Sequence, residues 1–176
     1  VWLFQGLPKS DKMELIIQKA TELGAAHIVP VITKNTIIKL DEKKSGQKIR
    51  RWQSIAEASA KQSKRSVIPV VHEPMRFSDA VKLAGDFEIS VIPYEHEEGI
   101  ESLCEAIVSF VPGRRIGAFI GPEGGFDRLE VSFAKKQGIL PVSLGKRILR
   151  TETAAIAILS MIMIRLEIAQ NAFKED

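Results

Sequence analysis

Six short apolar runs separated by helical patterns are the feature that most constrains the fold of this chain. Apolar and polar residues do not alternate within these runs, as they would in strands with one face in water. Strands buried on both faces are typical of mainly parallel sheets with helices on each side, so we predict an α/β fold. A length of 176 residues with 45% hydrophobic content favours one domain over residues 1–176, with a single well-buried core. The predicted strands span residues 1–4, 27–32, 67–71, 87–92, 116–120 and 140–143.

Helical periodicity fills the segments between the runs. The first helix has Pro8 and Ser10 at its start and Gly24 just past its end, which are typical start and stop signals. The last helix is apolar all round, which indicates burial on several sides, by the sheet and by a partner subunit. The helices after the first are predicted at 47–63, 78–84, 100–110, 127–137 and 151–170.

Cysteine and histidine usage excludes several classes of protein. The single cysteine, Cys104, rules out an internal disulfide and a multi-cysteine zinc site, and it suits the cytoplasm. No pair of histidines has the i, i+4 spacing of a helical zinc site, so no metal is expected. The longest apolar stretch, at 154–164, is much shorter than the roughly 20 residues that span a bilayer. The chain opens on a predicted strand, so we expect it to begin at a domain boundary rather than with a leader.

A glycine-rich loop follows the predicted strand at 116–120. It has the sequence GPEGGF over residues 121–126, and Asp127 after it has the position of a helix cap. Glycines let a ligand approach the backbone, and the carboxyl ends of parallel strands border the crevice where α/β folds bind ligands. A tight turn that needs three glycines would explain the loop equally well. The loop has neither the GxGxxG pattern of dinucleotide sites nor the Gly-Lys-Ser/Thr of phosphate loops, which weakens both nucleotide interpretations.

A second loop, with the sequence LGKRILR over residues 144–150, follows the last predicted strand. Glu152 lies just beyond it, in the first turn of the last helix, where a carboxylate is favourable. Exposure to solvent would explain the three basic residues, but it does not explain the apolar Ile148 and Leu149 between them. Tyr94 and Glu95 follow another predicted strand, so we expect them at the rim of the same crevice.

Two further motifs accompany these loops, KATELG at 19–24 and EAxxxQSxR at 57–65. Together with GPEGGF and with LGxRILRxETA at 144–154, they cover most of the chain. In sequence, order and spacing, the four motifs strongly resemble the bacterial 16S ribosomal RNA uridine-N3 methyltransferase family of the SPOUT superfamily. The combination is far more specific than either loop alone.

The resemblance implies a function, a fold and an assembly. The function is methylation, from S-adenosylmethionine, of N3 of a uridine in the 16S ribosomal RNA of the small ribosomal subunit. The fold is a mainly parallel sheet flanked by helices, with a deep trefoil knot at the C-terminus. The assembly is a homodimer with its active sites at the subunit junction. We expect the family's N-terminal PUA-like β-barrel to be absent from this chain.

The resemblance also places S-adenosylmethionine, in a bent shape, among the knot loops. Backbone groups of the two glycine-containing loops are expected to make much of the contact. The implied cofactor-binding residues are Ile120, Gly121, Pro122, Glu123, Gly124, Gly125, Leu144, Gly145, Ile148, Leu149, Arg150 and Thr153.

Uridine N3 carries a proton at neutral pH, so a base or a group that stabilises the uridine anion would assist methyl transfer. We predict that Arg150 and Arg65 stabilise the anion and that Glu123 or Glu152 removes the proton. Each residue also has a structural alternative. Glu123 could bond backbone amides of its loop, and Glu152 could favour the helix N-terminus. Arg65 could pair with Glu57 or with a phosphate.

Positive charge is concentrated between Lys34 and Arg65, where ten Lys or Arg residues stand against three acidic residues. The whole chain has a net charge of only +3. Phosphate neutralisation supplies most sequence-independent affinity for nucleic acid, so we expect this segment to bind ribosomal RNA, although a solvated helix face explains many charge runs equally well. The expected RNA-binding residues are Arg50, Arg51, Lys61, Gln62, Lys64 and Arg65.

Two other functions stay open at this point. Another knotted RNA methyltransferase, acting on the ribose 2′-hydroxyl, would use the same cofactor pocket. An RNA-binding module that assists ribosome assembly without activity would keep the basic segment but would not need intact glycine loops. The motif at 144–154 favours the uridine-N3 family over the first alternative, and the glycine loops favour an enzyme over the second.

Overall fold

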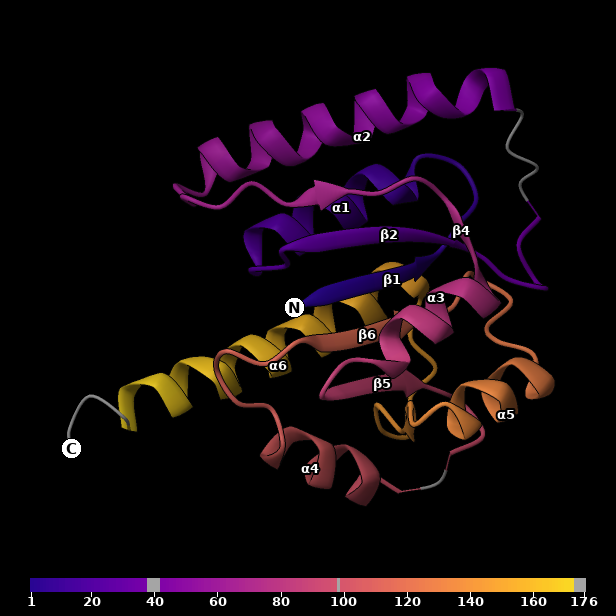
Figure 1. Cartoon of the computed structure of the whole chain (residues 1–176), viewed down its shortest axis with the longest axis vertical. Helices are drawn as coiled ribbons and strands as arrows, with labels where there is room; N and C mark the ends of the chain where they lie inside the picture. The colour runs from indigo at the N-terminus through magenta and orange to yellow at the C-terminus, as the bar shows by residue number, and fades with distance from the viewer. Residues whose placement is uncertain (38–41, 98, 173–176) are drawn as a thin grey trace.

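The computed structural model describes residues 1–37, 42–97 and 99–172, and within them seven strands form one sheet (Figure 1). Every pairing between strands is parallel, as the apolar runs predicted. The strands are β1 (Trp2–Gly6), β2 (His27–Ile32), β3 (Val70–Val71), β4 (Met75–Arg76), β5 (Ile89–Pro93), β6 (Ile116–Ile120) and β7 (Leu140–Val142). Their order is β3-β2-β1-β6-β5-β7, and β4 pairs with the same side of β2 as β3 does.

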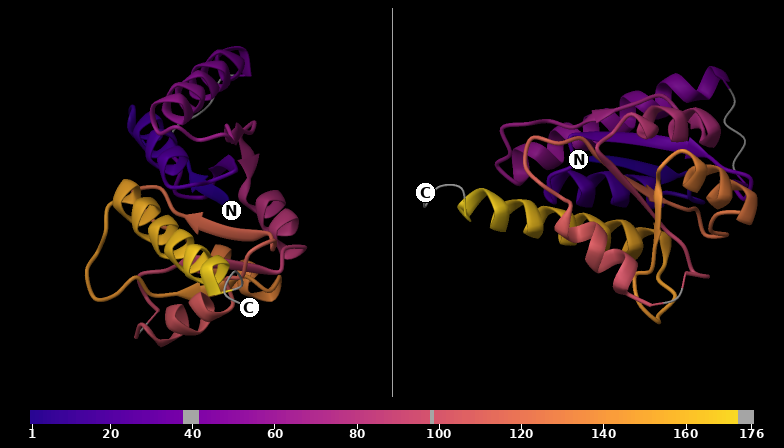
Figure 2. Two further views of the ribbon diagram at one scale, coloured as in Figure 1. Left: turned by 90° about the vertical axis from the view of Figure 1, so that its left-hand side faces the viewer. Right: turned by 60° about the horizontal axis from the view of Figure 1, so that its bottom comes forward.

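Helices cover both faces of this sheet. The helices are α1 (Lys12–Glu22), α2 (Glu42–Gln62), α3 (Phe77–Gly85), α4 (Glu101–Val108), α5 (Arg128–Lys136) and α6 (Thr151–Ala172). One core joins the sheet to α1, α2, α4 and α6, and a second core joins its other face to α3 and α5. Figure 2 shows α1 and α6 side by side on one face of the sheet and α3 on the other.

The central strand β1 explains why the apolar runs do not alternate. Leu3 and Phe4 are both fully buried, but Leu3 belongs to the core under α1 and α6, and Phe4 belongs to the core under α3 and α5. Successive side chains of a strand point to opposite faces, and here both faces are covered. Phe4 stacks on Phe119 of β6, with ring centroids 4.4 Å apart.

The sheet edge at β3 and β4 differs from the prediction. The predicted strand at 67–71 is reduced to its last two residues, because Val67 and Ile68 are exposed and Pro69 has no N–H to donate to a neighbouring strand. Strand β4 was not predicted, since two residues give no periodic pattern. The first helix begins at Lys12 rather than near Ser10, which has a positive φ of 57°.

The carboxyl ends of β1, β5, β6 and β7 lie at one end of the sheet, and the glycine loop continues from β6 there. A Cβ atom on Gly6, at the end of β1, would lie only 2.5 Å from Cδ of Pro122, so the glycine allows the loop to rest against β1. Asp127 and Glu130 form a capping box that starts α5 directly after this loop. Among the described residues, no helix is long and apolar enough to cross a membrane.

Candidate active site

A cavity of about 1130 Å³ lies at the carboxyl ends of β5, β6 and β7. Three loops form most of its wall: the segment after β5, the glycine loop after β6, and the loop between β7 and α6. Residues at the starts of α1, α4 and α6 complete the wall, among them Lys12. Pockets for one small molecule typically measure about 300–1,000 Å³, so this cavity has room for a cofactor and part of a second ligand. Topologically it lies where open α/β sheets bind ligands.

The glycine loop is both a tight turn and a wall of the cavity. Gly125 has a φ of +63°, and its N–H donates to the carbonyl of Pro122 at 2.9 Å. A Cβ on Gly121 would come within 3.0 Å of the Gly125 backbone, so the turn closes only with glycine there. Both glycines line the cavity. The loop is therefore a tight turn that needs its glycines, and the same turn lines the cavity.

Gly124 does not line the cavity, and its predicted contact with the cofactor stays a prediction. Its carbonyl accepts a hydrogen bond of 2.8 Å from the side-chain amide of Asn35, and a Cβ on Gly124 would meet Asn35 at 3.1 Å. The residues on either side of it, Glu123 and Gly125, do line the cavity. Gly124 therefore packs against the segment after β2 and supports the turn from outside.

Buried hydrogen bonds join the glycine loop to the start of α6. The hydroxyl of Thr151 donates to the carbonyl of Gly121 at 2.6 Å and accepts from the side-chain amide of Gln5 at 2.9 Å. Gln5 is fully buried on β1. The predicted cofactor residue Thr153 is exposed and lies outside the cavity lining, because residues three apart share a helix face and Thr151 and Ala154 point inward.

Lys12 connects the two candidate carboxylates. Its Nζ lies 3.2 Å from Oε1 of Glu123 and 3.3 Å from Oε2 of Glu152. Both oxygens of Glu123 also accept hydrogen bonds from the backbone N–H of Lys9, at 3.1 and 3.2 Å. Sequence reasoning missed Lys12, because a lone lysine in the first turn of a helix has the pattern of a solvated charge. Lys12 follows soon after the carboxyl end of the central strand β1, and that position could have indicated that it lies near the ligand crevice.

These contacts decide the charge state of Glu123. Partial burial raises the pKa of its carboxyl, but hydrogen bonds from its own backbone N–H, from Lys9 and from Lys12 outweigh burial and leave the pKa below the usual range. The hydrogen bond to Glu123 in turn raises the pKa of Lys12. Glu123 is therefore ionised at neutral pH, and a carboxylate with a lowered pKa is a weak general base.

The loop between β7 and α6 supplies a basic and partly apolar wall. Lys146, Arg147 and Arg150 line the cavity, together with Ile148, whose side chain is 88% exposed. Within the described part of the chain, the guanidinium of Arg150 has no hydrogen bond or ion pair, so it is free to meet a ligand. The remaining predicted cofactor residues that line the cavity are Ile120, Gly121, Pro122, Glu123, Gly125, Leu144, Gly145 and Leu149.

The segment after β5 forms an acidic wall. Tyr94 and Glu95 line the cavity as the strand pattern predicted, and Glu97 and Glu101 lie with them. In residues 1–37, 42–97 and 99–172, no group of three or more His, Cys, Asp or Glu side chains could hold a metal ion. The cavity thus has acidic and basic walls on different loops.

Arg65 lies at the end of α1, away from the cavity of the single chain, and its predicted catalytic role stays a prediction. Its guanidinium donates to the carbonyls of Thr21, Gly24 and Ala25, at 2.6, 3.2 and 2.9 Å, and it does not line the cavity. These carbonyls belong to the end of α1 and the turn after it, where helix carbonyls have no partner within the helix. Arg65 therefore closes the C-terminus of α1.

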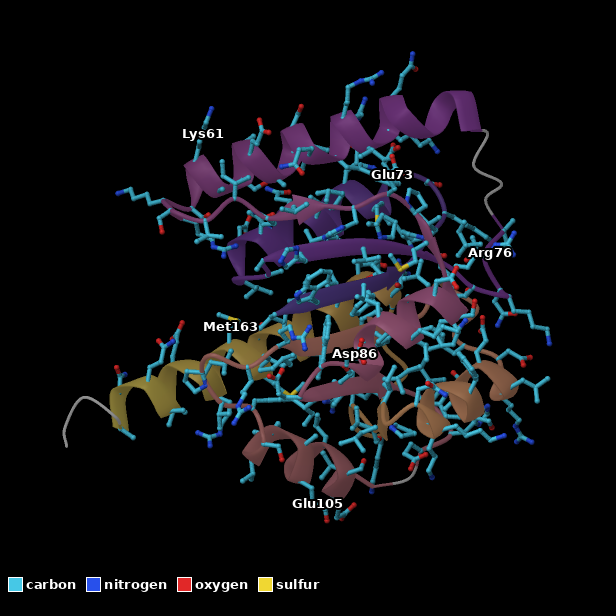
Figure 3. The ribbon with its side chains drawn as sticks, viewed as in Figure 1. Lys61, Glu73, Arg76, Asp86, Glu105 and Met163 are labelled. Carbon is cyan, nitrogen blue, oxygen red and sulfur yellow. The ribbon has the colours of Figure 1, made fainter. Side chains whose placement is uncertain are left out.

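The other predicted RNA-binding residues lie along α2 and just after it, at the β3 edge of the sheet. Arg50, Lys61, Gln62 and Lys64 are exposed, and Lys61 projects from α2 away from the sheet (Figure 3). Arg51 is exposed but pairs with Glu14 at 2.6 Å. None of these residues lines the cavity, which lies toward β5 and β7. Residues 38–41 of the basic segment lie outside the described residues.

Comparison with known proteins gives the family of this chain. The family model described as the RNA methyltransferase domain matches residues 1–163. The chain is 41% identical over 174 residues to ribosomal RNA small subunit methyltransferase E of Bacillus subtilis, covering 97% of this chain and 68% of that protein. It is 38% identical over 155 residues to the protein of the same name from Mesomycoplasma hyopneumoniae, covering 86% of this chain and 64% of that protein.

A solved structure agrees with these sequence matches. Ribosomal RNA small subunit methyltransferase E of Neisseria gonorrhoeae, bound to S-adenosylmethionine, superposes with a TM-score of 0.76 at 27% identity, over 94% of this chain and 65% of that one. The methyltransferase fold inferred from the motifs is thereby confirmed. The chain spans about two thirds of the length of these relatives. It belongs to the RNA methyltransferase domain family, among relatives named ribosomal RNA small subunit methyltransferase E.

Proposed function

We propose that this chain is the catalytic domain, over residues 1–176, of a cytoplasmic enzyme that uses S-adenosylmethionine to methylate N3 of a uridine in 16S ribosomal RNA. The observation that carries the proposal is the cavity between the two glycine-containing loops, which are the segments that carry the family motifs. Membership of the family and the cofactor bound by the Neisseria relative support it.

The residues at the cavity suit this cofactor. Gly125 and Gly145 both have positive φ, and a Cβ on Gly145 would meet no atom within 4 Å, so the backbone borders open space there. The apolar side chains of Ile120, Leu144 and Leu149 would hold the adenine ring beside backbone donors and acceptors. When bound, the cofactor supplies a methyl group on a positively charged sulfur.

Arg150 is the residue that we propose to stabilise the uridine anion. It lines the cavity with a guanidinium that is free to bind a ligand, whereas Arg65 is engaged by the end of α1. A positive group directed at developing negative charge lowers the barrier most where water is excluded. Glu123 is assigned to holding its loop, because its lowered pKa makes it a weak base and Lys9 and Lys12 occupy its oxygens.

The partners that we propose are ribosomal RNA and a second copy of this chain. The basic outer face of α2 neutralises RNA phosphates, but it lies at the β3 edge, away from the cavity. In a homodimer, RNA held by α2 of one subunit could enter the cavity of the other. Apolar residues Ile164 and Ile168, about 60% exposed on α6, would lie in the subunit interface.

Calorimetric titration with S-adenosylhomocysteine tests the cofactor site. The Gly125→Val variant should lose binding, because valine at positive φ would be strained and would project toward the cavity. Gly138→Val is the matched control, since Gly138 has a φ of +84° but lies outside the cavity lining. Binding by the parent and the control, but not by folded Gly125→Val, is expected. A folded parent that does not bind would contradict the proposal.

The reaction itself is tested by incubating the parent with small ribosomal subunits and labelled S-adenosylmethionine. Mass spectrometry of the digested RNA should find methylation on a uracil base. Methyl groups on ribose would instead identify the enzyme as a 2′-hydroxyl methyltransferase. Cofactor and RNA binding without any product would favour an assembly module.

A further inference from the structure

Lys12 lies between three segments of the proposed active site. It begins α1, immediately after the loop from β1, and its ammonium contacts Glu123 of the glycine loop and Glu152 in the first turn of α6. The backbone N–H of Lys9 reaches Glu123 from the same loop. One short stretch of chain therefore holds both walls of the cavity through two carboxylates.

The burial of Glu152 makes its contact with Lys12 important. The side chain of Glu152 is 16% exposed, and its Oε2 atom is shielded from solvent. Among the described residues, this oxygen has no partner with hydrogen-bond geometry, so the ammonium 3.3 Å away is the positive charge that balances it. A carboxylate oxygen that is removed from water without a hydrogen-bond donor is costly to bury unless a positive charge lies beside it.

Lys12 also sets the net charge of this cluster. With the ammonium present, the two carboxylates and Lys12 together carry a single negative charge. Without it, the two carboxylates would repel each other, and the glycine loop and the start of α6 would be pushed apart. This separation would alter the cavity next to Arg150, where a uridine anion would form.

We propose that Lys12 is a positioning residue for methyl transfer, which holds Glu123 and Glu152 together and thereby fixes the spacing between the glycine loop and the start of α6. The inference rests on the proposed function. Lys12 acts through the two carboxylates and takes no part in the transfer of the methyl group. Nothing in the sequence pattern distinguishes Lys12 from Lys9, whereas the structure gives them different environments.

The matched variants Lys12→Met and Lys9→Met distinguish the effect of the contacts of Lys12 from the effect of losing one positive charge. Both remove one positive charge from the same loop, but the side chain of Lys9 is exposed and has no hydrogen bond or ion pair in the described part of the chain. Lys12→Met should weaken S-adenosylhomocysteine binding and lower kcat by about tenfold to a hundredfold, as misplaced active-site groups do. Lys9→Met keeps the backbone N–H that donates to Glu123, so it should match the parent. Lys12→Arg should restore most of the loss.

A pH profile distinguishes this role from general support of the fold. In Lys12→Met, the acid limb of kcat/KM should move to higher pH, because the carboxyl of Glu123 loses the hydrogen bond and the positive charge of Lys12, which lower its pKa. An unchanged profile, together with unchanged affinity, would overturn the inference for Lys12 alone. A folded parent that binds no cofactor would overturn the proposed function and this inference with it.

Glu152→Gln provides a second variant if Lys12→Met does not fold. It keeps Lys12 and removes one of the two charges that Lys12 holds. Cofactor affinity should fall while circular dichroism and the unfolding transition stay close to those of the parent. Affinity equal to that of Lys9→Met would overturn the inference.

Discussion

At the scale of single residues, two arginines that look alike in the sequence have different environments. Arg150 lines the cavity, and its guanidinium is free within the described part of the chain. Arg65 donates to three carbonyls at the end of α1. Their side chains are chemically identical, so the difference between their roles comes from position alone.

We therefore expect Arg150→Met to lose activity and Arg65→Met to lose stability. Loss of Arg150 should lower kcat by about 10²–10³-fold, the cost of removing one group that stabilises an anion, with the urea midpoint unchanged. Loss of Arg65 should lower the free energy of unfolding by about 1–3 kcal/mol, because carbonyls lose their partners, with turnover per folded molecule kept.

Urea titration and single-turnover kinetics on both variants would measure this contrast. Lys61→Met is the control for stability, because Lys61 is exposed on the outer face of α2. A large kinetic loss in Arg65→Met with normal stability would return Arg65 to the active site. Because Arg65 does not line the cavity of its own chain, it would then have to act at the cavity of the partner subunit.

The sequence predicted some residues of the site and missed others for a physical reason. Gly121, Gly125 and Leu149 lie in continuous motifs next to strand ends, where a linear pattern is informative. Lys12 meets Glu123 and Glu152 only after folding, and no local spacing records that contact. Thr153 lies outside the cavity lining, because the face that a helical residue occupies depends on where α6 begins, which motif spacing does not fix.

At the scale of elements, the pairing of β2 with β3 brings two histidines together. Nδ1 of His27 lies 3.0 Å from Nε2 of His72, and the ring of His27 stacks on Trp2 with centroids 3.8 Å apart. Burial lowers the pKa of both imidazoles, and for His27 the neighbouring His72 lowers it further. One ring must be neutral to accept the hydrogen bond.

Stability should therefore fall in acid. Because the folded pKa values lie below the unfolded value of 6.5, the unfolded chain binds more protons, and stability decreases as pH drops below about 6.5. Urea midpoints at pH 7.5 and 5.5 should differ more for the parent than for His72→Asn. His96→Asn, at an exposed position, should keep the difference found in the parent. An equal difference in all three proteins would contradict the prediction.

Elements with a long, continuous apolar pattern were predicted with good bounds, and short ones were not. The strands β2 and β6 have the predicted bounds, because each run is buried on both faces along nearly its whole length. Strand β4 has two residues, and its existence depends on β2 being beside it. A strand that forms only because a neighbouring strand lies beside it cannot be predicted from the local sequence pattern.

At the scale of the whole molecule, the proposed dimer depends on α6. This helix is apolar on faces that the sheet does not cover, and Ile164 and Ile168 are 59% and 60% exposed in the single chain. The trefoil knot stays a prediction, as does the dimer. Apolar periodicity indicates which residues are buried, but it does not show whether the chain forms a knot or which buried residues face a partner subunit.

The double variant Ile164→Glu, Ile168→Glu should be monomeric, because charges on α6 would have to be buried in the interface. Sedimentation velocity should find a dimer for the parent and a monomer for the variant. Val67→Glu with Ile68→Glu, at exposed positions near the β3 edge, serves as the control and should stay dimeric. A monomeric parent would contradict the proposed assembly.

The hydrogen bonds of Thr151 have a consequence for the order in which this protein becomes active during its synthesis. Thr151 joins Gln5, near the beginning of the chain, to Gly121 and to the last helix. A nascent chain that ends before residue 151 has the glycine loop but lacks the hydroxyl that holds it and the wall that α6 supports. The cavity is completed only when α6 has been synthesised and has packed against the sheet, so a nascent chain that lacks α6 should not bind the cofactor.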